Sequence, residues 1–277
     1  MSDQRFKQMW KALGVFIFFF LMQLAVSMAA GALAAWQLRG LGMTAAAVDA
    51  AVLEQVKAWN AYLLLIADGL TVLALLLWGR FKERQPMMDY TALRRPLGGR
   101  GALLCVALGA AANFWFALAV NLIPWPAAWL EEYAASVSTL SGADVLTVAA
   151  VVLAAPCCEE LVFRGRIYGE LAVTIPAGAA VMLQAILFGG MHDGMIWMIY
   201  AFVLGCVLGY VRKLTGTLRA TLLVHMAFNG ASYLFDWFAG RWGEQGGAVT
   251  GALLGSAVLF IICIFRLNSL YRKEEQV

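Results

Sequence analysis

The sequence predicts an all-α fold, a polytopic bundle of about eight transmembrane helices that forms a single membrane domain over residues 1–277. Of all residues, 62% are hydrophobic and only 13% are charged, whereas a typical soluble domain carries about 25% charged residues. The mean hydropathy is +0.77, and apolar runs recur from end to end without a soluble-looking block. The formal net charge of +3 gives no reason to expect nucleic-acid binding, so the lipid bilayer is the expected partner.

Eight segments approach the length of about 20 mostly apolar residues that a transmembrane helix needs. They are residues 12–36, 59–79, 101–122, 143–163, 175–192, 194–211, 217–238 and 247–266. The first run is too long for the apolar part of a cleaved signal peptide, so we expect it to remain as a span. The fifth and sixth are short and meet near His192, which predicts a tilted, broken or re-entrant helix there.

Lysine and arginine concentrate in alternate connections between the predicted spans, and cytoplasmic connections of membrane proteins keep positive charge. The basic connections are the N-terminal tail, residues 80–100, 164–166 and 212–219, and the C-terminal tail. Both termini are therefore predicted to be cytoplasmic, in the inner membrane of a prokaryote or the endoplasmic reticulum of a eukaryote. Residues 123–142, on the other side, contain prolines and tryptophans typical of a segment anchored at the membrane interface.

Two carboxylates and a guanidinium, those of Glu159, Glu160 and Arg164, stand at the predicted cytoplasmic end of the fourth span. A charged side chain near the bilayer centre costs about 2.5–3.5 kcal/mol, so such residues usually face protein or a water-filled cavity. Glu160 and Arg164 are four residues apart on one helical face, where an ion pair can form. Glu159 points about 100° away and remains unpaired, which suits it to accept and return a proton. A snorkelling cluster at the interface is the alternative interpretation.

The chain has two histidines, His192 and His225, and each follows an apolar helical run. His225 and Asn229 share a helical face by their spacing of four, so both can direct hydrogen-bonding groups to one point. Counted from the basic borders, Glu159 and His225 lie at similar depths. A straight fifth helix would carry His192 about 24 Å inward, so meeting Glu159 requires a tilt, a later start or a break at residues 189–190. Taken singly, each histidine also fits a purely structural role.

Three short motifs together resemble the CPBP family: Glu-Glu-x-x-x-Arg at 159–164, Phe-x-x-x-His at 188–192 and His-x-x-x-Asn at 225–229. That family contains type II CAAX prenyl endopeptidases of the Ras-converting kind, and bacterial relatives linked to bacteriocin processing and immunity. The similar region runs from about Ala154 to Tyr233, within an expected catalytic core of residues 143–238. Each motif is weak alone, but three in the family's order and inside apolar helices make a specific combination.

The resemblance implies an intramembrane endopeptidase that cuts a membrane-associated substrate, either a prenylated CAAX-like protein or a peptide with a leader. The residues that match the family's catalytic and supporting positions are Glu159, His192, His225 and Asn229, together with the pair Glu160 and Arg164. Glu159 and His192 would activate water, and His225 and Asn229 would bind the oxyanion. This agrees with the chemistry, because peptide hydrolysis needs a base, an acid for the leaving amine and oxyanion donors.

Metal dependence stays open from the residues alone. Glu159, His192 and His225 would form a zinc-binding set of one glutamate and two histidines, with an open position for water. The H-E-x-x-H signature of many zinc proteases is absent from the sequence. Because catalytic zinc normally brings recognisable ligand spacing, a metal-independent reaction is the preferred interpretation.

The remaining polar and thiol residues fit supporting roles. The five cysteines all fall inside predicted spans, where we expect free thiols that pack as small apolar groups. Asp68 is costly in the second span and is a candidate for the wall of a cavity. Two other functions stay open: a membrane transporter, and a catalytically silent scaffold or immunity protein with the same fold. No internal repeat with paired broken helices favours the transporter.

Overall fold

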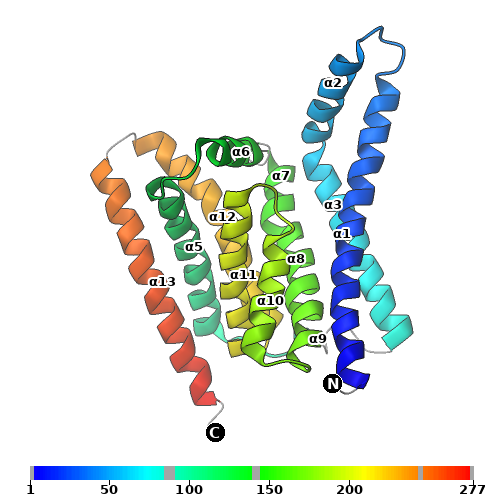
Figure 1. The fold of residues 1–277 in the computed structure, drawn as a ribbon. Helices are drawn as coiled ribbons and strands as arrows, with labels where there is room; N and C mark the ends of the chain where they lie inside the picture. Colours follow the sequence, from blue (N-terminus) through cyan, green and yellow to red (C-terminus); the bar gives the residue numbers. More distant parts are fainter. Residues whose placement is uncertain (1–2, 84–90, 139–143, 243–245, 275–277) are drawn as a thin grey trace.

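The computed structural model describes residues 3–83, 91–138, 144–242 and 246–274, and these residues form helices and connections with no strand among them (Figure 1). The separate helices are α1 (Asp3–Gln37), α2 (Ala45–Ala58), α3 (Asn60–Trp78) with η1 (Gly79–Glu83), α5 (Gly99–Leu122), α6 (Ala127–Ser138), α10 (Ala177–Gly189), α11 (Met195–Thr215), α12 (Leu218–Trp242) and α13 (Gly246–Glu274). One further continuous helix consists of α7 (Val145–Ala149), η2 (Ala150–Ala154), α8 (Ala155–Glu159), η3 (Glu160–Ile167) and α9 (Tyr168–Ala172).

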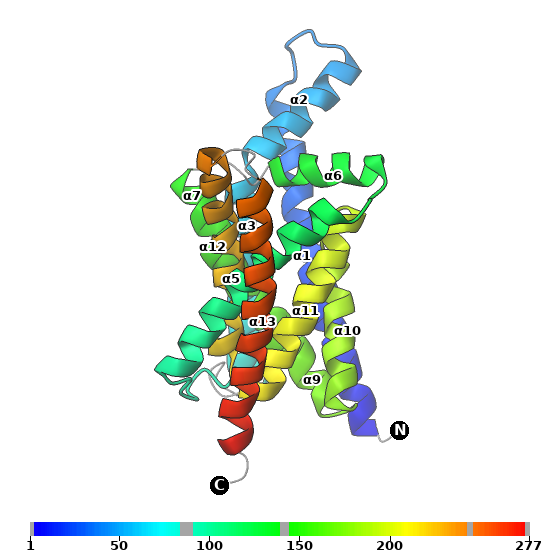
Figure 2. The ribbon, with the colours of Figure 1, turned by 90° about the vertical axis from the view of Figure 1, so that its left-hand side faces the viewer.

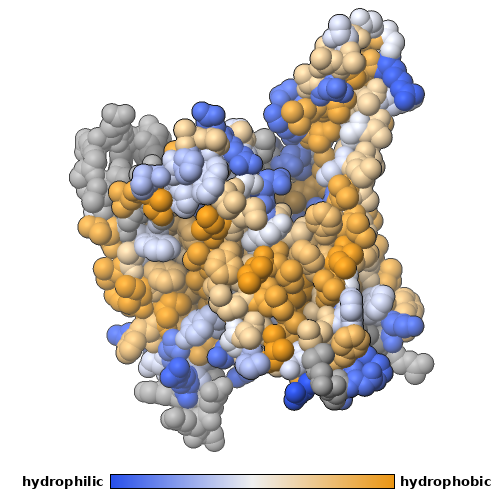
Figure 3. Space-filling model, viewed as in Figure 1, coloured by the Kyte–Doolittle hydropathy of each residue, from blue (hydrophilic) through white to orange (hydrophobic). Residues whose placement is uncertain are grey.

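The fold is that of an integral, multi-pass membrane protein. Six of the described helices are long and apolar enough to cross a membrane, and α10 is a shorter apolar helix. Figure 3 shows a broad hydrophobic belt between hydrophilic residues at the two ends of the molecule. Large apolar side chains such as Leu103 and Phe265, 71% and 72% exposed, face outward where lipid would cover them. The predicted total of eight spans, and the side on which the termini lie, remain predictions.

Both termini lie at one end of the helical bundle, and α2 and α6 lie at the other (Figure 1). The view turned by 90° shows α6 lying across that second end and α2 projecting beyond it (Figure 2). The interface segment predicted over residues 123–142 thus contains a helix, α6. The sequence did not predict α2, whose 14 residues are too few and too polar to span a membrane.

The helix that carries the acidic motif is longer than predicted. It runs from Val145 to Ala172 without interruption instead of ending near residue 163. Arg164 and Arg166, which marked a membrane border in the sequence, are only 0% and 6% exposed. Glu159 therefore lies near mid-helix, about 20 Å from either end at about 1.5 Å per residue. The prediction that this span ends near residue 163, directly after the acidic cluster, is wrong.

Two π-helical stretches, η2 and η3, flank Glu159 in this long helix. Pro156 has no N–H, and its ring would collide with the carbonyl four residues earlier in a regular α-helix. The turn before it is widened, and the N–H of Ala155 donates to the carbonyl of Ala150, five residues back. At the far end of η3, the N–H of Tyr168 likewise donates to the carbonyl of Phe163. Such widened turns occur frequently at functional sites.

Two apolar cores hold the bundle together, one on each side of the long helix's acidic motif. The first packs α1 against η3, α9 and α10 and includes Phe19, Phe163 and Phe188. The second joins α5, α11, α12 and α13 and includes Leu108 and Phe228. Small residues let these helices approach closely, as is common in membrane proteins.

The helix break predicted at residues 189–190, just before His192, is present. The fifth predicted span is α10, which ends at Gly189, and a short loop then turns into α11. Gly194 has φ +82 at the start of α11, a left-handed conformation that favours glycine. Because α10 is short and Glu159 is deep, His192 and Glu159 reach the same cavity without a tilted helix.

Candidate active site

A cavity of about 500 Å³ lies inside the bundle, and all four candidate catalytic residues line it. They come from three separate parts of the chain: Glu159 from α8, His192 from the loop after α10, and His225 and Asn229 from α12. Apolar and aromatic side chains form most of the remaining wall. A largely apolar cavity with a few convergent polar groups is the usual form of a binding or catalytic site.

The ion pair predicted from the spacing of Glu160 and Arg164 is confirmed. Nη1 of Arg164 donates to Oε1 of Glu160 at 2.7 Å, and both side chains are 0% exposed. Nη2 of Arg164 also donates to the carbonyl of Gly205 in α11 at 3.4 Å. The guanidinium lies over the ring of Phe188, 4.3 Å from its centroid, in a cation–π contact. The pair therefore links η3 to α10 and α11 beneath the cavity.

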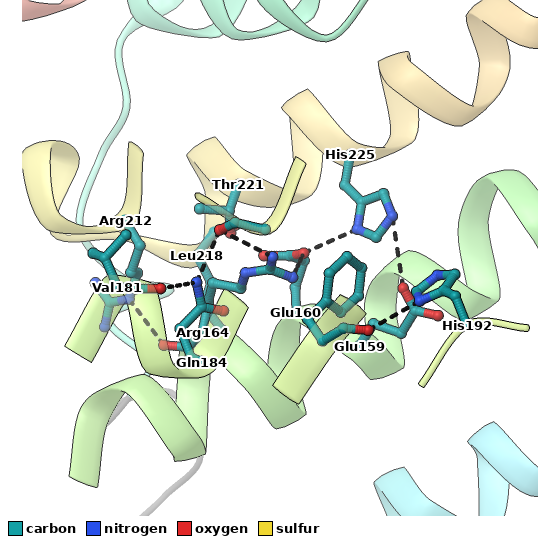
Figure 4. Close-up of polar contacts among 12 residues, drawn as sticks. Glu159, Glu160, Arg164, Val181, Gln184, His192, Arg212, Leu218, Thr221 and His225 are labelled. Carbon is teal, nitrogen blue, oxygen red and sulfur yellow. Dashed lines mark hydrogen bonds and ion pairs between the residues drawn. The ribbon is translucent and has the colours of Figure 1, made fainter. Parts of the chain in front are cut away.

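His225 is held between the two glutamates (Figure 4). Its Nδ1 lies 2.9 Å from Oε1 of Glu160, and its Nε2 lies 3.6 Å from Oε2 of Glu159. Because an ionised carboxylate only accepts hydrogen bonds, Nδ1 carries a proton and donates it to Glu160. This bond fixes the ring so that Nε2 faces Glu159 on the cavity wall.

His192 is held by the backbone of its own turn. Its Nδ1 donates to the carbonyl of Phe188 at 2.9 Å, since a carbonyl oxygen can only accept. Nε2 is then the nitrogen that carries the lone pair in the neutral ring. The Phe188 ring packs edge-on against both imidazoles, with centroids 4.9 Å from His192 and 5.9 Å from His225. One aromatic ring thus sets the position of both histidines.

Asn229 lies one helical turn beyond His225, on the same cavity wall. Its Nδ2 donates to the carbonyl of Val151 in η2 at 2.8 Å. A carboxamide nitrogen carries two hydrogens, so this bond orients the group and leaves a second hydrogen for a ligand. The widened turn at η2 supplies the acceptor, because its carbonyls are not all used in regular helical bonds.

Asp68 and Gln23 extend the polar wall of the cavity beyond the three motifs. Asp68 in α3 is 3% exposed and accepts a hydrogen bond from Nε2 of Gln23 in α1 at 3.0 Å. Both residues line the same cavity as Glu159. The sequence singled out Asp68 but missed Gln23, although a glutamine in an apolar span is the same kind of signal.

Gln184 is a second polar residue that the sequence analysis missed. It is 0% exposed in α10, and its Nε2 donates to the carbonyl of Gly205 at 2.8 Å. Arg164 donates to that same carbonyl, so Gln184 joins the polar layer beneath the cavity. Its signal was again an amide side chain within an apolar run.

In the described parts of the chain, no group of three or more His, Cys, Asp or Glu side chains has the geometry to hold a metal ion. Glu159, His192 and His225 share a cavity, and Nδ1 of each histidine is hydrogen-bonded to a protein acceptor, an arrangement that also occurs in histidines that bind a metal through Nε2. The cysteines are free thiols, as predicted, and the adjacent Cys157 and Cys158 diverge, one exposed and one buried.

Comparison with known proteins finds one matching family. A family model described as type II CAAX prenyl endopeptidase Rce1-like matches residues 141–231. No curated protein and no solved structure matches the chain. The matched region holds all seven residues of the three motifs and ends within α12. Residues 141–231 are thus similar to the type II CAAX prenyl endopeptidase Rce1-like family, and this similarity indicates a membrane-embedded peptide hydrolase.

Proposed function

We propose that this protein is an intramembrane endopeptidase in which Glu159 activates water to attack a peptide bond. The observation that carries the proposal is the surroundings of Glu159. Its neighbour Glu160 takes the Arg164 guanidinium, so Glu159 is left without that ion-pair partner and faces the cavity near Nε2 of His225. A carboxylate in this position is suited to act as a general base.

The hydrolysis follows from the roles of the four cavity residues. Glu159 takes a proton from a water molecule whose second hydrogen is accepted by Nε2 of His192. The resulting hydroxide attacks the carbonyl carbon, the oxygen becomes an oxyanion, and Glu159 returns the proton to the nitrogen as the C–N bond breaks. Protonated His225 and the free hydrogen of Asn229 donate to the oxyanion, which lowers the barrier.

Glu160 and Arg164 act by positioning. The hydrogen bond from Nδ1 of His225 to Glu160 fixes the ring with Nε2 toward the cavity. Arg164 in turn balances the charge of Glu160 in a site from which water is excluded. This division explains why two adjacent glutamates are needed, one free and one paired.

The proposed reaction uses no metal ion. The missing H-E-x-x-H signature supports this, and no three ligand side chains stand close enough together among the described residues to hold an ion. The proposed substrate is a membrane-associated polypeptide, of the leader-peptide or CAAX-like kind. The substrate must present an extended segment, because its scissile bond has to pass between helices to reach the residues of the cavity.

The test compares the membrane proteomes of cells that carry the wild-type chain, Glu159→Gln or the matched control Glu54→Gln. Glu54 lies in α2 with its side chain 72% exposed, so its substitution should leave cleavage unchanged. We expect uncut substrate to accumulate with Glu159→Gln, while the protein inserts and is retained as wild type. Equal cleavage products in all three samples would show that the catalytic assignment is wrong.

A chelator arm tests the metal-free part of the proposal on the substrate that this comparison identifies. Cleavage by purified membranes should persist with 1,10-phenanthroline. Loss of cleavage with the chelator, and its return when zinc is added back, would instead establish a metal-dependent enzyme.

A further inference from the structure

We infer that Asp68 of α3 is a positioning residue of the reaction, which carries a proton on Oδ2 and donates it as a hydrogen bond toward the Glu159 carboxylate. This inference rests on the proposed function, in which Glu159 is the general base. Asp68 lies outside the three motifs and outside the family match over residues 141–231. The supporting observations are its burial, its hydrogen bond to Gln23 and the charges around Glu159.

Asp68 presents a carboxyl group to the same cavity as Glu159. Its side chain is 3% exposed and lines the cavity from a helix long and apolar enough to span a membrane. Helix α3 packs against α8, and the thiol of Cys158, the residue before Glu159, lies beside the Asp68 carboxyl. In the described part of the chain, Asp68 interacts with no lysine, arginine or histidine side chain. No cation there balances a negative charge on Asp68.

Glu159 therefore has a second carboxyl neighbour besides Glu160. Asp68 interacts electrostatically with Glu159 more strongly than the adjacent Glu160 or Arg164 does. The Arg164 guanidinium is hydrogen-bonded to Glu160, so it does not neutralise the pair formed by Asp68 and Glu159. Two ionised carboxylates close together in an apolar cavity repel each other, so one of them keeps a proton. Because the reaction needs Glu159 in its ionised form, the proton belongs to Asp68.

The hydrogen bond from Gln23 determines which oxygen of Asp68 carries this proton. Nε2 of Gln23 donates to Oδ1 of Asp68 at 3.0 Å. A carboxylic acid accepts through its carbonyl oxygen and donates through its hydroxyl, so the proton lies on Oδ2. Oδ2 is buried and has no hydrogen-bond partner among the described residues. A buried donor without an acceptor is unfavourable, and the ionised Glu159 is the acceptor that the cavity provides.

Three further ionisable side chains lie near this pair of carboxyl groups. The Cys158 thiol beside Asp68 is only a weak donor and a weak acceptor. His192 is held by its own turn through Nδ1. His225 approaches Glu159 from α12, with Nε2 at 3.6 Å from Oε2. Glu159 thus lies between Asp68 on the α3 side and His225 on the α12 side.

The role of Asp68 in the reaction is to keep Glu159 ionised until water is attacked. A carboxylate without a donor in an apolar cavity tends to take up a proton, and it then cannot act as a base. A hydrogen bond from Asp68 favours the ionised form. Asp68 keeps its own proton throughout, so the proton that Glu159 takes from water is the one that it returns to the leaving amine.

Infrared spectroscopy of the purified full chain in lipid detects this proton without any need for catalysis. A protonated carboxyl group has a carbonyl stretching band that an ionised carboxylate lacks. The wild type is compared with Asp68→Asn, Glu159→Gln and the matched control Asp49→Asn, whose position in α2 is exposed. We expect Asp68→Asn to lose one such band and the other two variants to keep it. The inference is overturned if Asp68→Asn keeps every band or if Glu159→Gln also loses one.

Cleavage of the substrate that the proteome comparison identifies tests the same hydrogen bond in the reaction. Asp68→Asn retains an N–H donor in place of the hydroxyl, so its rate should stay within about threefold of the wild type. Asp68→Val retains no donor and should lower the rate by about 10²-fold, whereas Asp49→Val should leave it unchanged. Equal rates for Asp68→Asn and Asp68→Val, whether low or near the wild type, overturn the inference.

Two comparisons separate this role from folding and from the proposed function. Thermal unfolding in detergent shows whether each variant folds, and the infrared band with Asp68→Asn decides the inference even if Asp68→Val does not fold. An inactive Glu159→Gln together with an inactive Asp68→Asn refutes only the role of Asp68. An active Glu159→Gln refutes the proposed function itself, and the role of Asp68 with it.

Discussion

Replacing Arg164 with alanine should destabilise the protein strongly, because it leaves the Glu160 carboxylate buried without its guanidinium partner. Both side chains are 0% exposed and 2.7 Å apart. Removing one member of a buried ion pair typically costs about 3–5 kcal/mol. The cation–π contact with Phe188 adds about 1–2 kcal/mol. His225 still donates to Glu160, which places the expected loss at the lower end of the sum, about 4 kcal/mol.

A loss of that size is a large share of the roughly 5–15 kcal/mol by which folded domains are stable. The assay is thermal unfolding in detergent, followed by size-exclusion chromatography of a fluorescently tagged chain. The matched control is Lys7→Ala, which removes an ion pair of the same four-residue spacing, Lys7 with Asp3 at 2.6 Å, whose side chains are 70% and 79% exposed. Exposed pairs contribute little, so this variant should melt like the wild type.

The double substitution Glu160→Gln with Arg164→Met removes both charges and should recover much of the lost stability, since no uncompensated charge remains buried. It should not recover activity, because His225 loses its carboxylate partner. Should Arg164→Ala melt at the same temperature as Lys7→Ala, the pair would not be the buried support that this reasoning requires.

Two further predictions concern packing and the oxyanion. A Cβ at Gly109 would overlap the backbone carbonyl of Val224, so Gly109→Ala should lower the free energy of unfolding by about 1–3 kcal/mol. The control is Gly14→Ala, because a Cβ there would have no atom within 4 Å. In the same unfolding assay this variant should be neutral or slightly stabilising. Asn229→Ala should lower the cleavage rate constant by about 10²–10³-fold, with a smaller effect on substrate affinity. Both quantities are measured on a purified substrate. A rate constant within a factor of about two of the wild type would show that Asn229 does not bind the oxyanion.

The sequence was sufficient for the features that depend on local periodicity. Each predicted span corresponds to a helix, and the four-residue spacing of Glu160 and Arg164 correctly predicted their ion pair. The spacing of His225 and Asn229 correctly predicted one shared face on the cavity wall. These inferences succeed because helical geometry fixes which neighbours in sequence become neighbours in space.

The sequence was insufficient where contacts between distant parts of the chain decide whether a polar residue is buried or exposed. Two arginines directly after an apolar run are typical of the end of a membrane span. Arg164 and Arg166 are instead buried by other helices, and their helix continues to Ala172. Nothing local shows that Nδ1 of His225 bonds to Glu160, 65 residues away in the chain. The depth of the site was therefore accessible only once the helices were assembled.

Oε1 of Glu160 accepts hydrogen bonds from both Arg164 and His225, so Glu160 supports both the folded structure and the reaction. Glu159 supports only the reaction. Descendants of this chain that abandon hydrolysis are thus free to mutate the first glutamate, but they must keep or lose the second glutamate and the arginine together to stay folded. Genes with that partial motif would encode pseudoenzymes, which keep the cavity and bind the same polypeptides but do not cleave them.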